Sequence, residues 1–312
     1  MKQIYALTLR NTRLFFRDKG TFFTSLITPL ILLLLYATFL ANLYEDSFTA
    51  MLSGSSPISE GLIRGAVAGQ LVSSLLAVSS VTVTFCSNML MVQDKVTGAR
   101  RDLTVCPVRT SHLAIGYYLS TALTSLLVCF GALAIGLAFI YARGWYLSAA
   151  DVALLFVDTI LLVMFGTAIS SIINYFLTSQ GQISAVGTVV SAGYGFICGA
   201  YMPISQFGKG LQNAVMFSPG TYGTALLRRH AMQSVLLAME REGVPKAMTD
   251  AMREMVDMKL FFFGRTVAEW VMYLVLFGST LALVSVYLVI NLVNERRENA
   301  ARCRSAAAAE LL

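Results

Sequence analysis

The chain has 312 residues, of which 56% are hydrophobic and 13% are charged, with a net charge of +6 and a mean hydropathy of +0.69. Soluble domains carry roughly 25% charged residues, so this composition excludes a water-soluble fold. Several uncharged runs reach the length of about 20 apolar residues that a helix needs to cross a bilayer, and they lack the alternating polarity of β-barrel strands. We therefore expect an all-α membrane protein with six transmembrane helices, whose backbones satisfy their own hydrogen bonds in lipid.

Residues 1–20 are predicted to form an N-terminal amphipathic helix that lies at the membrane interface. Apolar residues such as Leu7 recur on one side, and Arg10, Arg13 and Arg17 recur on another. The basic residues are spread along the segment instead of preceding a short apolar run, which argues against a cleavable signal sequence. The alternative is a plain cytoplasmic start to the first span.

Six apolar segments follow in chain order. They are residues 21–43, 65–91, 113–141, 152–175, 183–200 and 267–292. Together they define a transmembrane domain over residues 21–292, with a charged cytoplasmic segment at 93–111 and a long extracellular segment at 201–266. Residues 293–312 are predicted to be a cytoplasmic tail.

Lys and Arg residues orient these spans. The N-terminal segment carries five of them, the loop after the second span four and the tail four, whereas the loops after the first and third spans carry one each. Because short cytoplasmic loops are enriched in Lys and Arg, both termini are expected in the cytoplasm. We expect a multi-pass protein of a bacterial plasma (inner) membrane that contacts lipid and has no nucleic-acid partner.

The five cysteines predict no disulfide. Cys86, Cys129 and Cys198 fall inside apolar segments, while Cys106 and Cys303 lie in basic stretches that are expected to be cytoplasmic. Thiols stay reduced in that compartment.

The segment at 93–111 contains a short amphipathic stretch that ends before Pro107, which cannot continue a helix. Such a piece could dock onto a partner, or it could be a solvated loop between helices. Its charged pair Asp94-Lys95, together with Gly98, Leu103 and Pro107, resembles the stretch between the second and third spans of ABC-2 type transporter permeases. Departures from that pattern are Val96 and Arg101, where the family often has acidic residues, and Cys106, which replaces a hydroxyl residue.

The second half of the chain carries the same resemblance. The run Gly199-Ala-Tyr-Met-Pro203, with Ser218-Pro219 and Arg228 further on, is similar to the family's glycine-rich fifth span and its re-entrant outer hairpin. The resemblance implies a hairpin built on Gly199, Pro203 and Pro219. It also implies that the ATP-binding subunit contacts the cytoplasmic segment through Asp94, Lys95, Gly98, Arg100, Arg101, Leu103 and Pro107.

The chain has no Gly-x-x-x-x-Gly-Lys-Ser/Thr phosphate loop, so it is not expected to be an enzyme or to hold a cofactor. The resemblance implies that a separate ABC ATP-binding subunit holds ATP and Mg and that a second permease, identical or different, completes the pathway. The implied activity is ATP-driven export, and we expect a hydrophobic or amphipathic substrate such as a drug, an antibiotic or a lipid-like molecule.

Two stripes of small and polar residues are candidates for the substrate pathway. In the second span they are Ser73, Ser80, Thr84, Ser87 and Asn88, and in the fifth span they are Ser184, Thr188, Ser191 and Gly195. Their spacing of three or four residues places each set on one helix face. The same pattern also suits close helix packing in lipid, which Gly195-x-x-x-Gly199 illustrates. Both interpretations stay open.

Two acids lie within apolar segments, Asp158 in the fourth span and Glu269 at the start of the sixth. Charged groups at the bilayer centre are costly and usually face protein or water. They could bind a cationic substrate or relay protons, or they could have a structural role with a neighbour as partner. An ion-coupled secondary transporter that uses both acids is therefore the alternative function, although no inverted repeat is evident.

Methionines are frequent in and beside the outer segment. They are Met232, Met239, Met248, Met252, Met255 and Met258. Such flexible side chains could form an adaptable apolar surface for ligands, or they could pack among the segment's own helices. The two histidines, His112 and His230, have no metal-ligand spacing, so no metal site is predicted.

Overall fold

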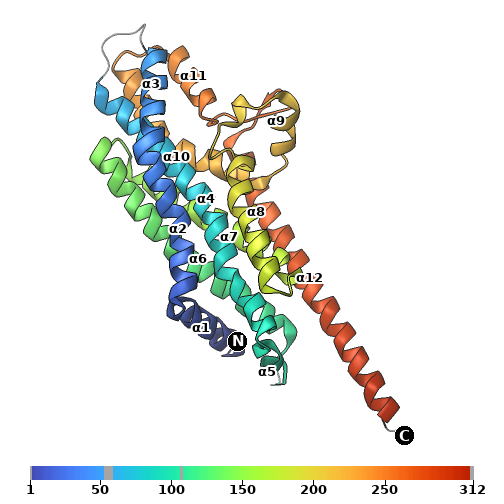
Figure 1. The fold of residues 1–312 in the computed structure, drawn as a ribbon. Coiled ribbons are helices and arrows are strands. Elements are labelled where there is room, and N and C mark those ends of the chain that lie inside the picture. Colours follow the sequence, from blue (N-terminus) through green and yellow to red (C-terminus); the bar gives the residue numbers. More distant parts are fainter. Residues whose placement is uncertain (1, 53–58, 106–107, 310–312) are drawn as a thin grey trace.

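A computed structural model describes residues 2–52, 59–105 and 108–309 (Figure 1). The helical elements are α1 (Lys2–Arg17), α2 (Lys19–Leu35), a π-helical turn (Tyr36–Leu40), α3 (Ala41–Leu52), α4 (Glu60–Val96), α5 (Ala99–Val105), α6 (Thr110–Arg143), α7 (Ala149–Phe176), α8 (Gln180–Ile197), a 3-10 turn (Ile204–Gln206), α9 (Lys209–Val215), α10 (Pro219–Arg241), α11 (Lys246–Met255) and α12 (Glu269–Ala309). Strands β1 (Phe261–Phe262) and β2 (Arg265–Thr266) pair antiparallel, with Phe261 opposite Thr266.

The long helix α4 forms the centre of the bundle. Residues 65–85 are all buried, because α2, α6, α7, α8 and α10 pack around them. Small residues permit this close packing, as expected where lipid offers no hydrophobic drive for helix association. A Cβ added at Gly69 would lie 2.5 Å from the carbonyl oxygen of Ala231 in α10, and one added at Gly136 of α6 would lie 2.6 Å from Val72.

Five helical runs among the described residues are long and apolar enough to cross a membrane. They are Lys19–Leu52, Glu60–Val96, Thr110–Arg143, Ala149–Phe176 and Glu269–Arg296. The helical membrane class is thereby confirmed. The predicted fifth span corresponds to α8, which has only 18 residues and includes Gln180 and Gln182. At roughly 1.5 Å per residue it is about 27 Å long, so the count of six spans remains a prediction.

The first span extends further than its apolar run predicts. α2, the π-helical turn and α3 follow one another without a break as far as Leu52, although Pro29 lies inside α2. Phe48 is buried against the bundle and α4 already begins at Glu60, so most of the described part of the loop expected over residues 45–64 is helical. Tertiary packing overrides the weak local preference there. Residues 53–58 of this loop lie outside the described residues.

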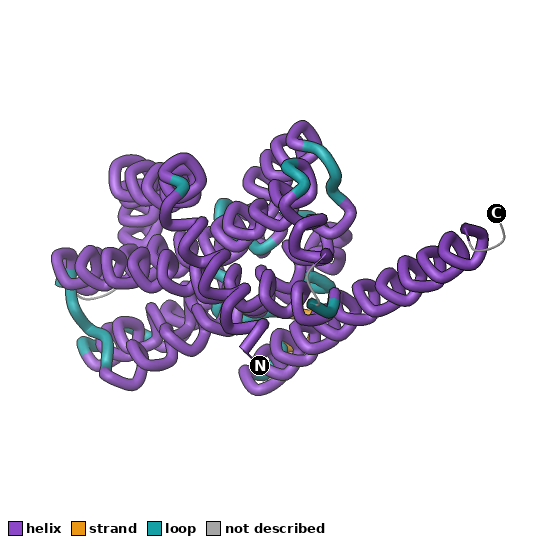
Figure 2. Tube along the Cα trace, turned by 90° about the horizontal axis from the view of Figure 1, so that it is seen from below, coloured by secondary structure: helices purple, strands orange, loops and turns teal. Residues whose placement is uncertain are grey.

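α1 is an amphipathic helix that crosses the foot of the bundle (Figures 1 and 2). Leu7, Asn11 and Phe15 are four residues apart and form its buried side. They pack toward α6, where the absence of a side chain at Gly116 leaves room for Leu7. The location of α1 at a membrane interface remains a prediction.

Much of the predicted outer segment, residues 201–266, packs into the helix bundle. α10 packs against α4, α7 and α12, and most of its residues from Gly220 to Met239 are buried. Four of the six methionines are buried, namely Met232, Met239, Met252 and Met258, and the other two pack against the same core. They fill the core instead of forming an open surface. α12 continues through Ala309, so the backbone of the predicted tail extends the last span (Figure 2).

Candidate functional site

The elbow between α4 and α5 holds the predicted coupling residues. Gly98 has a φ of +84°, a conformation that favours glycine and turns the chain after Val96. Asp94 lies one turn before the elbow and is buried. It accepts two hydrogen bonds from Arg10 of α1, at 2.7 and 3.2 Å, and one from the Tyr117 hydroxyl of α6 at 2.6 Å. Asp94 therefore joins three helices, and its hydrogen bond raises the pKa of Arg10.

Lys95 makes a second joint at the same place. Its ammonium group donates to the carbonyl oxygens of Asn174 and Leu177, both at 3.1 Å, and to that of Tyr175. These carbonyls lie at the C-terminus of α7 and at its C-cap Leu177, where a cation also complements the helix dipole. Lys95 thus ties the elbow to α7.

α5 presents the outward side of the elbow. Leu103 is half-buried and packs with Leu7, Met91 and Tyr117, whereas Arg101 is exposed. Arg100 is half-buried near Tyr287 and Asn291 of α12. Pro107 lies outside the described residues. The predicted set therefore divides into two groups. Asp94 and Lys95 link helices within the chain, and the short helix α5 exposes Arg101.

The predicted stripe on α4 is enclosed within this chain. Ser73, Ser80, Thr84, Ser87 and Asn88 are all buried. The Asn88 amide donates to Ser171 of α7 at 3.0 Å and to Ser170 at 3.3 Å, and it accepts from Thr121 of α6 at 3.3 Å. Gly166 of α7 leaves no room for a side chain, because an added Cβ would be 2.7 Å from the Thr84 hydroxyl. These residues lie at helix contacts.

The stripe on α8 has a different setting. Ser184 and Thr188 are exposed and Ser191 is half-buried. The opposite side of α8 packs on α4, where Gly187 lies against Phe85 and Met89. Gly195 is buried beneath the ring of Tyr201, which occupies the space of a Cβ. The two stripes therefore do not face one common space among the described residues of this chain.

A buried ion pair holds the turn after α8. Arg228 of α10 and Asp257, at 1% and 5% side-chain exposure, lie 3.1 Å apart. Arg228 also donates to the carbonyl oxygen of Gly199, and Asp257 accepts hydrogen bonds from the backbone N–H groups of Ile204 and Ser205. Of the predicted hairpin residues, Gly199 has a φ of +73° where α8 has ended, Pro203 precedes the 3-10 turn, and Pro219 begins α10.

The two intramembrane acids share one cluster, which the sequence pattern did not reveal. Asp158 is buried and accepts hydrogen bonds from His230 Nδ1 at 2.6 Å and from the Tyr273 hydroxyl at 2.8 Å. The second ring nitrogen of His230 lies 3.4 Å from Glu269, which pairs with Arg229 at 3.0 Å. One indication of such a cluster was present in the sequence, because an acid within an apolar span requires a partner.

The geometry of this cluster favours a protonated His230. Both ring nitrogens of His230 face carboxylate oxygens, so the doubly protonated imidazolium satisfies both contacts. Burial alone lowers the pKa of His230, but the hydrogen bonds and charges of Asp158 and Glu269 outweigh it and raise the pKa. Among the described residues, no group of three or more His, Cys, Asp and Glu side chains is placed to hold a metal ion.

Comparison with known families agrees with this arrangement. Residues 2–230, which include α1 to α9 and the first half of α10, match the family model described as ABC-2 type transporter. No curated protein matches the chain. The match covers most of the 312 residues, and the chain therefore belongs to the ABC-2 type transporter family.

Proposed function

We propose that this chain is the permease subunit of an ATP-driven exporter for a hydrophobic or amphipathic substrate. Membership of the family makes it the membrane domain of an ABC-type transporter and implies association with an ABC ATP-binding subunit. In the proposal that subunit holds ATP and Mg, and a second permease, identical or different, completes the pathway. The elbow between α4 and α5 is the observation that carries the proposal.

The elbow is built to transmit movement. Its outward side carries exposed Val96 and Arg101, on which a partner can dock. Behind that side, Asp94 is linked to α1 and α6 and Lys95 to the end of α7. A displacement of α5 by the ATP-binding subunit would therefore act on α4 and, through these links, on α1, α6 and α7.

The pathway is proposed to lie along the exposed side of α8. Ser184 and Thr188 offer small polar side chains there beside Val189, which is 71% exposed. Such a mixed surface suits an amphipathic substrate or the facing helix of a second permease. In this proposal the stripe on α4 supports the bundle behind α8.

The proposed membrane orientation places both termini in the cytoplasm of a bacterial cell. α1, α5 and the end of α12 lie toward one end of the molecule, whereas α11 lies at the other (Figure 1). A cysteine placed at exposed Thr97 should resist an impermeant thiol reagent in intact cells, while one at exposed Ala247 should react. Labelling at Thr97 would reverse the orientation.

The decisive experiment reverses the charge of Arg100 and Arg101 in α5. Repulsion or loss of pairing at a docking surface costs several kcal/mol, so co-purification with the ATP-binding subunit and ATP-dependent transport should each fall by at least about tenfold. The matched control is Arg241→Glu, an exposed charge at the end of α10. Wild-type values for the double variant would refute the docking assignment, and transport without the ATP-binding subunit would favour an ion-coupled transporter that uses Asp158 and Glu269.

A further inference from the structure

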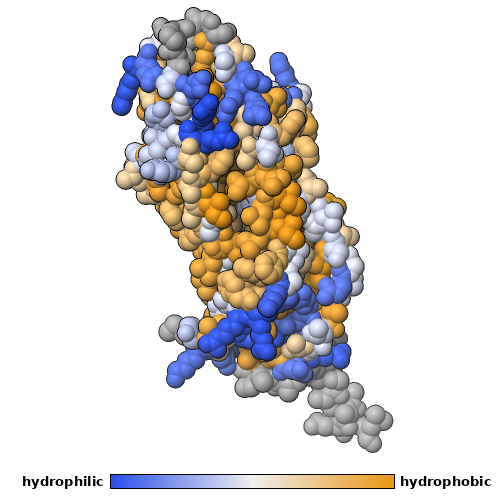
Figure 3. Space-filling model, turned by 60° about the vertical axis from the view of Figure 1, so that its left-hand side comes forward, coloured by the Kyte–Doolittle hydropathy of each residue, from blue (hydrophilic) through white to orange (hydrophobic). Residues whose placement is uncertain are grey.

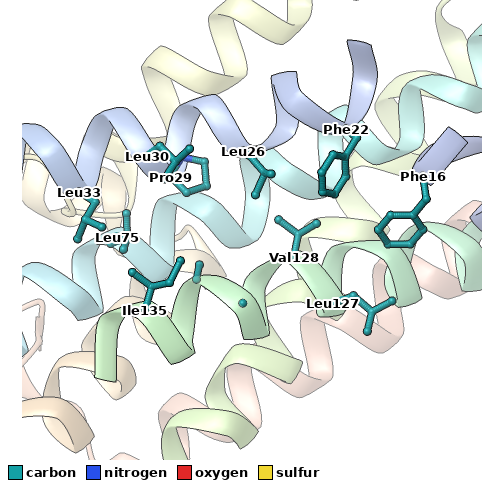
Figure 4. A pocket seen from close by; sticks show the side chains of 12 residues that line it. Phe16, Phe22, Leu26, Pro29, Leu30, Leu33, Leu75, Leu127, Val128 and Ile135 are labelled. Carbon is teal, nitrogen blue, oxygen red and sulfur yellow. The ribbon is translucent and has the colours of Figure 1, made fainter. Parts of the chain in front are cut away.

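An apolar crevice opens between α2 and α6. Figure 4 shows Phe22, Pro29 and Leu33 of α2 facing Val128 and Ile135 of α6. The crevice has a volume of about 280 Å³, and each residue that lines it is apolar. Water would have no hydrogen-bonding partner among these side chains, so the crevice favours an apolar occupant.

Pro29 of α2 and Gly131 of α6 are the two lining residues with unusual backbone or side-chain properties. Pro29 has no backbone N–H and cannot make the regular helical hydrogen bond within α2. Gly131 of α6 has no side chain, and a Cβ added there would meet nothing within 4 Å. α2 and α6 both pack on α4, whose Leu75 forms part of the floor between them. The gap is therefore part of the helix arrangement and is not closed by a long side chain.

The length of the crevice matches half the thickness of the hydrocarbon core of a bilayer. It follows α2 from Phe22 to Leu33, eleven residues on, which is roughly 16 Å at about 1.5 Å per residue. One leaflet contributes about half of a hydrocarbon core that is about 30 Å thick. A single extended acyl chain of a lipid fits these dimensions.

One end of the crevice has a net positive charge, because three exposed cations there outnumber the exposed carboxylate of Asp18. Lys19 lies three residues before Phe22, so it occupies the same face of α2 one turn closer to the polar end. Arg13 and Arg17 are exposed on α1 beside Phe16, which also lines the crevice. None of these three cations has an ion pair within the described part of the chain. Figure 3 shows this polar end below a broad apolar belt.

We propose that the crevice binds one anionic phospholipid, with an acyl chain between α2 and α6 and its phosphate at Lys19 and Arg17. Basic residues at the membrane surface attract anionic lipids, and the apolar groove selects a chain lying along the helices. The lipid would stabilise α2, which supports α4 on this side. The proposed function enters only in assigning this end to the cytoplasmic leaflet.

The experiment compares lipid binding to the purified, delipidated full-length protein by native mass spectrometry. The probes are phosphatidylglycerol and phosphatidylcholine with identical acyl chains. We expect one phosphatidylglycerol molecule per chain, bound at least about tenfold more tightly than phosphatidylcholine. Gly131→Leu should abolish that binding by filling the crevice, whereas Lys19→Glu should remove the preference for the anionic lipid.

Gly278→Leu is the matched control. Gly278 is an exposed glycine of α12 whose added Cβ would also meet nothing within 4 Å, but it is remote from the crevice. Both leucine variants should unfold at the wild-type temperature, and only Gly131→Leu should lose the lipid. Unchanged binding by Gly131→Leu, or equal affinity of the wild type for both lipids, overturns the proposal. Neither result depends on the ATP-binding subunit, so the proposed function is tested separately.

Discussion

Asp94 near the α1 end and Asp158 near the α10 end occupy closely similar environments. Each is a buried carboxylate on a central helix that accepts a hydrogen bond from a tyrosine hydroxyl, Tyr117 at 2.6 Å and Tyr273 at 2.8 Å. Each also pairs with a basic side chain of a helix from another part of the chain. That partner is Arg10 for Asp94, but it is a histidine for Asp158.

The difference in the cation gives the two ends different responses to pH. Arginine stays charged at any physiological pH, so the joint at Asp94 is permanent. Histidine titrates near neutrality, so the joint at Asp158 depends on a proton. A buried carboxylate can therefore link helices permanently or only while its partner is protonated. The identity of the partner, arginine or histidine, decides which.

The largest effect is expected from removing the fixed cation at the α10 end, with Arg228→Met. This change leaves Asp257 buried without its partner, which costs about 3–5 kcal/mol. Thermal unfolding of the purified protein should show the loss. Arg229→Met is the control, since Arg229 is 38% exposed and its pair with Glu269 is worth at most about 1 kcal/mol. Equal losses of stability for the two variants would mean that the buried pair of Arg228 and Asp257 does not stabilise the turn after α8.

A smaller loss is expected from Asp94→Asn, which keeps a hydrogen-bond acceptor for Tyr117 but removes the counter-charge of Arg10. Hydrogen bonds to charged groups contribute roughly 1.5–3 kcal/mol, and the unfolding free energy should fall within that range. Arg13→Gln on the exposed side of α1 should stay within about 0.5 kcal/mol of wild type. If Asp94→Asn lowers the unfolding free energy no more than Arg13→Gln does, the contacts of Asp94 do not hold the helices together.

The joint at His230 should make stability depend on pH. Because its pKa is raised in the folded protein, its contribution is complete below the ordinary value of about 6.5 and is lost as pH rises through the raised pKa. The groups that face it are Asp158, Glu269 and Tyr273, with Asp151 further along α7. The unfolding temperature of the wild type should fall by a few degrees between pH 6 and pH 9.

His230→Gln is the comparison for this titration. Glutamine keeps hydrogen-bonding capacity but cannot gain a charge, so the variant should be less stable at pH 6 and nearly independent of pH. Asp94→Asn should keep the wild-type slope, since Arg10 does not titrate in this range. A wild-type slope in His230→Gln would assign the proton to another group.

The smallest effect is expected at the joint between α4 and α7. Lys95→Met removes a cation from the C-terminus of α7, an interaction worth about 0.3–1 kcal/mol. Lys95→Arg should retain most of it. The clearer measurement is hydrogen exchange at the last turn of α7, which should quicken in Lys95→Met alone. Unchanged exchange would mean that the elbow does not stabilise the end of α7.

Composition and hydropathy alone determined the membrane class, the amphipathic character of α1 and five of the long spans, because burial in lipid needs only a continuous apolar run. The family resemblance followed from short patterns around Asp94 to Leu103 and around Gly199. Such patterns can be recognised in a sequence because a turn or a short helix is formed by neighbouring residues. Pattern alone could not distinguish a packing stripe from a pathway stripe on α4, since both use small polar residues at helical spacing.

Only the tertiary structure decided which partners the charged residues have. Arg10 lies 84 residues from Asp94, and His230 lies 72 residues from Asp158. No periodicity links positions so far apart, because each pair is made where helices from distant parts of the chain cross. The helix continuing to Leu52 and the buried position of α10 have the same origin. Both depend on the surface that α4 and its neighbours offer once they have packed, and that surface does not exist in the linear sequence.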